Sequence, residues 1–287
     1  GIQQSRYVSA TGEYHKANDS KNYYGYGLAS RLKLLDELGV KFSFEKAYRL
    51  QEVGEMFGNG YTVVANLDLK PESSQNLNVG AYYGLRIHKH KIFLEGSWFY
   101  RRANDFIYSV VYQSNSSVSR FENTSKVKVT GLEGDLKYNY ADLLYVNANL
   151  SYQNAINMTK YSPGSAGSTT EATYLNKIPN QPWLLGNLDM SIGKNNILGK
   201  DSRMQLNLGS QYVHWFYLTW EAFGNKADKS TIPDQYIHNA SISNSWKKGR
   251  YNLSLECRNI TNNLAYDNFR LQKPGRAFSV KLRYFIQ

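Results

Sequence analysis

Few side chains in this sequence have the types and spacing that chemistry requires. Ser210 and His214 lie four residues apart, so a strand would place both on one face, as a serine nucleophile and its base require. No Gly-x-Ser-x-Gly motif accompanies them, and no oxyanion-stabilising partner is evident. His88 and His90 could bind a metal ion weakly, but a solvated basic turn explains this pair more simply. The sequence therefore predicts no catalytic residue, no metal site and no cofactor.

The single cysteine argues against a disulfide-stapled protein, and the distribution of positive charge argues against a nucleic-acid-binding protein. Cys257 rules out a disulfide framework, and it shares a strand phase with Leu253 and Leu255, which predicts an apolar filler rather than a reactive thiol. The net charge is +11, but the 34 Lys and Arg residues are scattered and no recognition motif accompanies them. We therefore expect no nucleic-acid partner, because basic groups near lipid headgroups or in a polar lumen account for the charge.

Aromatic side chains are abundant, with 24 Tyr, 12 Phe and 5 Trp. Four of them gather near one expected connection: Trp215, Tyr217, Trp220 and Phe223. They could stack on a small ligand, and they fit equally well as a girdle at the membrane interface beside a strand end. We name these four as the candidate ligand-binding residues.

The elements that must position these residues are β-strands. Apolar and polar residues alternate with a period of two over 77–87, 144–153 and 278–286. The polar phase is rich in Asn, Ser, Gln and Gly, as a crowded wet interior would be. Mean hydropathy is −0.55, a value that alternation produces even when each strand has an apolar face. No stretch approaches the roughly 18 to 20 apolar residues of a membrane-spanning helix, which leaves a soluble all-β protein or a membrane barrel.

The pattern predicts about twelve strands, many longer than the roughly 5 to 6 residues of a typical globular strand. We expect them at 5–16, 22–35, 39–48, 74–87, 91–110, 126–139, 143–155, 183–193, 202–217, 235–247, 250–260 and 276–286. Leucines at helical spacing make an amphipathic helix over 28–38 the alternative there, although the Tyr- and Gly-rich run before it favours strand, turn, strand. A short helical turn is expected within 50–57.

Short and long connections alternate along the chain. Tight connections are expected at 35–39, 88–90, 140–142, 194–201 and 247–249, and long ones at 49–73, 111–125, 156–182, 218–234 and 261–275. All six prolines fall in or at the rim of the long connections, where they remove no hydrogen bond from a strand. This sorting is typical of a transmembrane barrel, and a soluble sandwich or carbohydrate-binding module has no reason to show it.

The stretch 44–74 resembles TonB-dependent receptors. In that family an aromatic-Arg motif ends one strand, and a short loop leads to a motif of the form Asn-x-x-Leu-x-Pro-Glu. The residues in those places are Ala47-Tyr48-Arg49-Leu50 and Asn66-Leu67-Asp68-Leu69-Lys70-Pro71-Glu72. The family's usual proline is absent, since Gln51 follows Leu50.

Four further motifs follow in the family's order. They are an Asp-x-Ile element at Asp105, a Gly-hydrophobic-Glu strand at Glu133, an Asn-to-Tyr corner from Asn259 to Tyr266, and the opening of the closing strand at Gly275-Arg276. The resemblance implies structural roles for Arg49, Asn66, Pro71, Glu72, Asp105, Glu133, Asn259, Tyr266, Gly275 and Arg276. The last strand departs from the pattern, because Ile286 and Gln287 stand where an aromatic residue usually ends these barrels.

The resemblance implies an all-β fold, an antiparallel transmembrane β-barrel. About twelve strands are present as the C-terminal half of a barrel of about 22 strands. Residues 1–287 then form one partial transmembrane β-barrel domain, with the plug domain expected outside this chain. No secretory signal precedes Gly1, so we expect the start to be processed, truncated or internal to a longer protein.

The resemblance also implies a function, the active transport of a scarce nutrient across the bacterial outer membrane. Its implied partners are membrane lipid and lipopolysaccharide, the receptor's own plug and remaining strands, an inner-membrane TonB-type energy coupler, and a small-molecule or chelate ligand. A ferric siderophore or similar small chelate is the favoured ligand. Haem receptors carry a functional His near the 49–72 loop, which has none here, and the C-terminal corner lacks the long insert of glycan importers.

Alternatives remain open at this point. Within the family they are receptors for haem, cobalamin or a glycan. Outside it they are an outer-membrane phospholipase that uses Ser210 and His214, and a passive twelve-strand pore. We also expect 5–16 and 276–286 to have unpaired edges, because a half-barrel cannot close on itself.

Sidedness gives the first testable prediction. The long connections 156–182 and 218–234 should face the outside, and the tight connections 88–90 and 247–249 should face the periplasm. A membrane-impermeant thiol reagent applied to intact cells should label a cysteine at Ser165 and spare one at His90. Labelling at 90 with none at 165 would contradict this topology.

Overall fold

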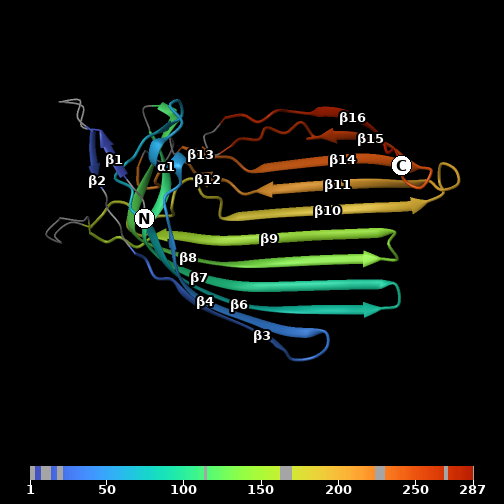
Figure 1. Ribbon diagram of the computed structural model, residues 1–287, viewed down its shortest axis with the longest axis horizontal. Helices are drawn as coiled ribbons and strands as arrows, with labels where there is room; N and C mark the ends of the chain where they lie inside the picture. The colour runs from blue at the N-terminus through green and yellow to red at the C-terminus, as the bar shows by residue number, and fades with distance from the viewer. Residues whose placement is uncertain are drawn as a thin grey trace.

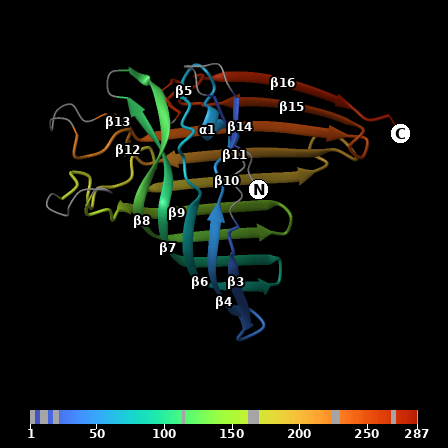
Figure 2. The same ribbon diagram turned by 60° about the vertical axis from the view of Figure 1, so that its left-hand side comes forward.

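Eleven antiparallel strands form one curved wall in the computed structural model, and a short twelfth strand joins the same sheet (Figures 1 and 2). The structure describes residues 4–7, 14–17, 22–112, 115–161, 170–223, 230–267 and 271–286. From one edge to the other the strands are β3 (Tyr26–Lys33), β4 (Leu38–Arg49), β6 (Glu72–Ile87), β7 (His90–Tyr112), β8 (Asn115–Tyr140), β9 (Leu144–Asn157), β10 (Leu184–Asn195), β11 (Arg203–Val213), β14 (Gln235–Trp246), β15 (Tyr251–Arg258) and β16 (Ala277–Tyr284). The twelfth, β5 (Val63–Val64), pairs with β8 in parallel.

The strand register turns the sequence alternation into two distinct faces. Residues paired across neighbouring strands share a face, and one such row joins Leu94, Leu136, Ala148 and Leu188. The adjacent row joins Glu95, Asp135, Asn149 and Asn187 on the opposite face. We call the first face of this sheet the apolar wall and the opposite face the polar wall. On the polar wall, Lys41 and Glu95 form an ion pair of 2.6 Å, and Arg31 donates a hydrogen bond to the Tyr82 hydroxyl at 2.9 Å.

The two outermost strands each have one neighbour among the described residues. They are β3 and β16, and every residue of both is exposed. The expected unpaired edge at 276–286 is therefore confirmed. The expected strand 5–16 is wrong, because β1 (Gln4–Tyr7) and β2 (Tyr14–Ala17) form a separate hairpin and leave β3 as the other edge. Thr11-Gly12, a poor strand sequence, stands between them.

The connections are sorted by length, as the sequence predicts. Tight ones lie at the end where β6 meets β7 and β14 meets β15, the turn end, and the long ones lie at the opposite, loop end (Figure 1). Tight turns use left-handed backbone at His88, Asp142 and Lys248. The expected long loop at 111–125 is wrong, because β7 and β8 continue to Tyr112 and from Asn115. The 26 residues of β8 span about 85 Å, well beyond the roughly 30 Å of a bilayer's hydrocarbon core.

Three local predictions can be compared directly. Residues 28–38 form strand, turn, strand rather than a helix, and α1 (Val53–Phe57) confirms the helical turn expected within 50–57. The strand expected at 202–217 ends earlier, at Val213, and β12 (Phe216–Tyr217) then pairs with β13 (Thr231–Ile232) apart from the wall. No helix among the described residues is long and apolar enough to span a membrane. Ser165 lies outside the described residues.

Glycines on the polar wall make room for aromatic rings from the next strand. A Cβ on Gly131 would lie 2.2 Å from the Tyr152 carbonyl oxygen and 2.4 Å from the ring of Phe99, its cross-strand partner. Gly39 receives the ring of Tyr82 in the same way. An aromatic ring that covers a glycine shields the exposed backbone and fixes the strand register.

This packing predicts that Gly131 tolerates no side chain. In the complete receptor, Gly131→Ala should lower the free energy of unfolding by about 1 to 3 kcal/mol, because the methyl group collides with backbone. Gly134→Ala is the matched control on the same strand, since its Cβ would meet nothing closer than 4.0 Å, and it should change stability by less than about 0.5 kcal/mol. Urea unfolding followed by heat-modifiable gel migration measures both, and equal stabilities would contradict the steric argument.

Candidate functional site

A buried carboxylate organises the loop end of the polar wall. Glu72, the first residue of β6, is 1% exposed. It forms ion pairs with Arg101 and, at 3.6 Å, with Arg49, and it accepts a hydrogen bond of 3.3 Å from the backbone N–H of Ile107. A buried charge is tolerated only with such partners. Two of the motif residues that the resemblance singles out, Arg49 and Glu72, therefore contact each other directly.

The same arginine holds the connection between β4 and β6, residues 50–71, which we call the crossing segment. Arg49 contacts Glu55 of α1 at 2.8 Å, and the Glu55 carboxylate also accepts from the backbone N–H of Glu52 at 2.9 Å, which caps the helix. Met56 and Leu69 pack against Ile107 and Phe121 beneath. Because β5 pairs with β8, the crossing segment spans the polar wall from β4 to β8.

Amide side chains complete this attachment. Asn66 donates to the Phe121 carbonyl at 2.7 Å. Asn123 donates to the carbonyl oxygens of Lys70 and Asp105 at 3.0 and 2.7 Å and accepts from the Lys70 N–H at 2.8 Å, just before Pro71. Asp105 has a φ of 50°, and the chain kinks there. Asn123 was missed by sequence reasoning, since a lone Asn in an expected loop gives no signal. Glu133 lies on the polar wall opposite Ser97 and Ser151.

The second motif group closes the corner between β15 and β16. Asn259, 4% exposed, donates to the Asn263 carbonyl at 2.8 Å and accepts from its N–H at 3.0 Å. Tyr266 donates its N–H to Gln235 at 2.7 Å, and Arg276 donates its N–H to Asn262 at 2.9 Å. A Cβ on Gly275 would lie 2.7 Å from that same Asn262 oxygen, so a side chain there would displace the Asn262 amide from its hydrogen bond with Arg276. Asn259, Tyr266, Gly275 and Arg276 thus all contact neighbouring residues of the chain, and the structural role that the resemblance implies for them stays a prediction.

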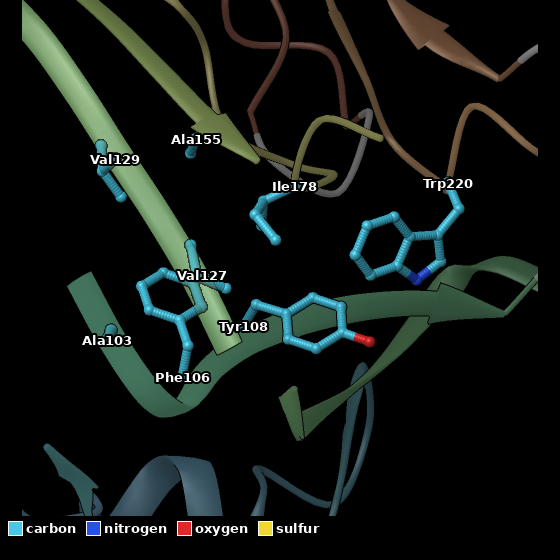
Figure 3. Close-up of a cluster of buried hydrophobic side chains, with 8 residues drawn as sticks. All are labelled: Ala103, Phe106, Tyr108, Val127, Val129, Ala155, Ile178 and Trp220. Carbon is cyan, nitrogen blue, oxygen red and sulfur yellow. The ribbon is translucent and has the colours of Figure 1, made fainter. Parts of the chain in front are cut away.

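The four candidate ligand-binding residues do not form one site. Trp215 and Tyr217 lie together, with ring centroids 5.2 Å apart, and both contact Trp183 in edge-to-face geometry at 4.5 and 6.2 Å. We call Trp183, Trp215 and Tyr217 the aromatic cluster. Trp220 is 7% exposed and packs on Tyr108, 5.4 Å away, within a buried group that includes Ile178 and Val127 (Figure 3). Phe223 is exposed. Sequence reasoning missed Trp183, which stands on a different connection.

Charged groups adjoin the aromatic cluster. The Lys177 ammonium lies 3.3 Å from the centre of the Trp183 ring, a cation–π contact. Burial lowers the pKa of Lys177, and the Glu221 carboxylate opposes this shift. Burial and the same carboxylate raise the pKa of Tyr217. The cluster thus presents flat aromatic faces beside a cation at the loop end.

The serine and histidine pattern rearranges in three dimensions. Ser210 does not contact His214. Its hydroxyl lies 2.9 Å from Nδ1 of His238 on the next strand, and His214 contacts the Tyr212 hydroxyl at 2.6 Å and Asp234 at 2.9 Å. His90 lies 2.8 Å from the Tyr138 hydroxyl. Among the described residues no group of three or more His, Cys, Asp or Glu side chains could hold a metal ion.

The family model for the β-barrel of TonB-dependent receptor-like proteins matches residues 3–260. The chain belongs to the TonB-dependent receptor family. The siderophore receptor PiuA from Acinetobacter baumannii superposes with a TM-score of 0.69 at 15% identity, over 98% of this chain and 38% of that one. The copper transporter OprC superposes with a TM-score of 0.63 at 16% identity, over 90% and 38% of the two chains. The siderophore receptor PirA from the same Acinetobacter species gives 0.62 at 17%, over 91% and 40%. No curated protein matches.

The fold of TonB-dependent receptors determines which face of the sheet contacts lipid and which contacts the lumen. The chain spans about two fifths of the length of these solved receptors and forms a partial transmembrane barrel. The apolar wall therefore faces lipid and the polar wall faces the lumen. The crossing segment and its Glu72 attachment lie on the lumen side.

Removing the buried charge should loosen the crossing segment. Glu72→Gln in the complete receptor should lower the free energy of unfolding by about 2 to 3 kcal/mol. This is less than the roughly 3 to 5 kcal/mol of a fully buried pair, because Arg49 and Arg101 remain about one third exposed. Chymotrypsin should then cleave after Tyr61, in the crossing segment, faster than in the unmodified protein.

The matched control is Asp36→Asn, which breaks the Lys33–Asp36 pair of 2.6 Å in an exposed turn and should leave both readouts unchanged. If Glu72→Gln behaved like this control, the carboxylate would not hold the segment.

Proposed function

We propose that this chain is the C-terminal part of a bacterial outer-membrane receptor that actively imports a ferric siderophore or a similar small metal chelate. The observation that carries the transport class is the family match over residues 3–260. Three features favour a chelate as the ligand: the aromatic cluster, the adjoining Lys177 and the net charge of +11. Flat aromatic faces stack on planar ligand groups, and positive charge attracts an anionic complex of a hard metal with oxygen donors.

The proposal assigns a direction to the molecule and a set of partners. The loop end faces outside, where lipopolysaccharide surrounds the barrel, and the turn end faces the periplasm. The remaining strands close the barrel against β3 and β16, and a plug domain occupies the lumen. Because a plugged lumen admits no free diffusion, uptake requires an inner-membrane TonB-type coupler. Residues 1–287 contribute barrel wall and loop contacts.

Receptors for haem, cobalamin or a glycan are the alternatives within the family. Two alternatives come from other classes of protein, a passive pore and an enzyme. A passive twelve-strand pore would need β3 and β16 to pair with each other, and in the described residues each pairs on one side only. The phospholipase pair expected from the sequence, Ser210 with His214, is not formed, because Ser210 contacts His238 and His214 contacts Tyr212 and Asp234.

Growth on defined iron sources tests the ligand class. Deleting the complete gene should abolish growth when a ferric siderophore is the sole iron source, and should leave growth on haem, cobalamin and oligosaccharides unchanged. The control is the same strain carrying the intact gene on a plasmid. Loss of growth on a glycan with every iron chelate unaffected would overturn the ligand proposal and leave the family assignment intact.

The aromatic cluster gives a residue-level prediction. Trp215→Ala combined with Tyr217→Ala should weaken chelate binding at least about fivefold, because an aromatic contact contributes roughly 0.5 to 1.5 kcal/mol. Trp220→Ala should leave affinity unchanged but lower stability, since Trp220 packs on Tyr108 rather than facing a ligand. Fluorescence titration of the complete receptor separates the two. Reduced affinity in the Trp220 variant with none in the double variant would place the ligand elsewhere.

A further inference from the structure

We infer that a cavity beneath the corner between β15 and β16 binds a small ligand in which a carboxylate or similar oxyanion is joined to an apolar body. The cavity, which we call the corner cavity, has a volume of about 640 Å³, within the roughly 300 to 1,000 Å³ of small-molecule sites. It lies on the polar wall at the loop end, between β10, β11 and β14 on one side and the corner residues 259–275 on the other. No residue of the aromatic cluster lines it, so this site goes beyond the proposed function and is separate from it.

The floor of the corner cavity is apolar, although it belongs to the polar wall. Leu185 of β10 pairs with Val213 of β11, and Ile237 of β14 lies one row farther toward the turn end. Phe216 and Ala265 add apolar surface from β12 and from the corner. Burial of apolar surface against this floor favours a ligand with an apolar body.

The amide groups that line the cavity offer donors and no acceptors. Gln235 is 5% exposed, and its side-chain oxygen accepts the Tyr266 N–H at 2.7 Å. The Asn239 oxygen likewise accepts the Asn259 N–H at 2.9 Å. Because a backbone N–H occupies each oxygen, the amide nitrogen is the group left over, and neither nitrogen donates to a residue that the structure describes. A buried donor without an acceptor is unfavourable, so both amides suit a ligand that brings acceptor oxygens.

Two cations line the same cavity, Arg258 and Lys273. Arg258 donates to Glu256 at 2.7 and 3.4 Å, which offsets part of its charge and leaves other guanidinium N–H groups for a ligand. Lys273 forms no ion pair within the part of the chain that the structure describes. An ionised acceptor gains charge-assisted hydrogen bonds beside these cations, which are stronger than those of a neutral acceptor.

The two halves of the site together define the class of ligand. The apolar floor gives no partner to a small hydrated anion, and the donors and cations disfavour a neutral or cationic molecule. A compact carboxylate with an aromatic or aliphatic body satisfies both, because its body covers the floor while its oxygens reach the donors.

Fluorine NMR titration of the complete receptor in detergent tests this inference. The probe 4-fluorobenzoate has the apolar body and the carboxylate, and 4-fluorobenzamide has the same body without the charge. The acid should bind saturably and at least about fivefold more tightly than the amide. Trifluoroacetate, which has the charge and almost no body, should bind at least about fivefold more weakly than 4-fluorobenzoate.

An isosteric pair of variants locates the binding. Asn239→Asp keeps the oxygen that accepts from Asn259 but replaces the donor by a negative charge, so it should abolish binding of the acid. Asn78→Asp makes the same change on the polar wall at β6, six strand positions away. That distance exceeds the Debye length of about 10 Å, so this control should change the affinity by less than about twofold.

Two further variants separate the charge from the floor. Lys273→Gln, at an exposed side chain, should weaken binding of the acid at least about fivefold and leave binding of the amide unchanged. Ile237→Trp fills the floor and should abolish binding of both probes, and heat-modifiable gel migration shows whether each variant folds. Should Ile237→Trp fail to fold, Lys273→Gln still decides the outcome.

Equal affinity for acid and amide, the absence of saturable binding, or a loss with Asn78→Asp as large as with Asn239→Asp would each overturn the inference. Because the readout is binding of a simple acid, failure of siderophore uptake would not affect it.

Discussion

The structure depends on one constraint, that a barrel wall is a single strand thick. Every backbone N–H and C=O in hydrocarbon must be bonded to a neighbouring strand, and the two faces of each strand meet different media. The face on which each side chain lies is therefore fixed across the paired strands, from Leu94 and Glu95 on β7 to the residues in register with them on β10. A wall of this kind has no central core. The buried apolar groups lie instead at the loop end, where connections fold back onto the wall, as around Phe106, Leu218 and Met56.

The same constraint explains why the motif residues are polar and clustered. Connections that cover the lumen side remove water from the polar wall, so charges there need partners within the protein. Glu72 is 1% exposed and has two arginines and a backbone N–H as partners, which offset the cost of removing its carboxylate from water. The Lys41–Glu95 pair lies farther toward the turn end, where both side chains remain partly exposed, and contributes less. Burial, rather than the ion pair itself, distinguishes the attachment point from the rest of the lumen.

The face on which a strand residue lies and the lengths of most connections were predictable from the sequence, because each depends on neighbouring residues in the chain. The faces of 77–87 and 144–153 follow from alternation alone, and α1 follows from the spacing within 50–57. Contacts between distant residues were not predictable. Ser210 has His214 four residues away, yet its partner is His238, 28 residues away on the paired strand. Tertiary packing likewise decides that Trp220 is buried while Trp215 is only half-buried, and that 111–125 continues two strands. The family motifs identified positions, but their contacts required the fold.

A few residues break the alternation of apolar and polar faces, and each needs a compensating contact. Ala103, Val127, Val129 and Ala155 are apolar residues on the polar wall, and Ile178 and Trp220 from the long connections cover them (Figure 3). Ser210 and His238 are the reverse case, polar residues on the apolar wall, and they form a hydrogen bond of 2.9 Å with each other across neighbouring strands. An unpaired polar group is unfavourable in hydrocarbon, so each exception is compensated within the protein: by the covering connections at the first and by this cross-strand hydrogen bond at the second.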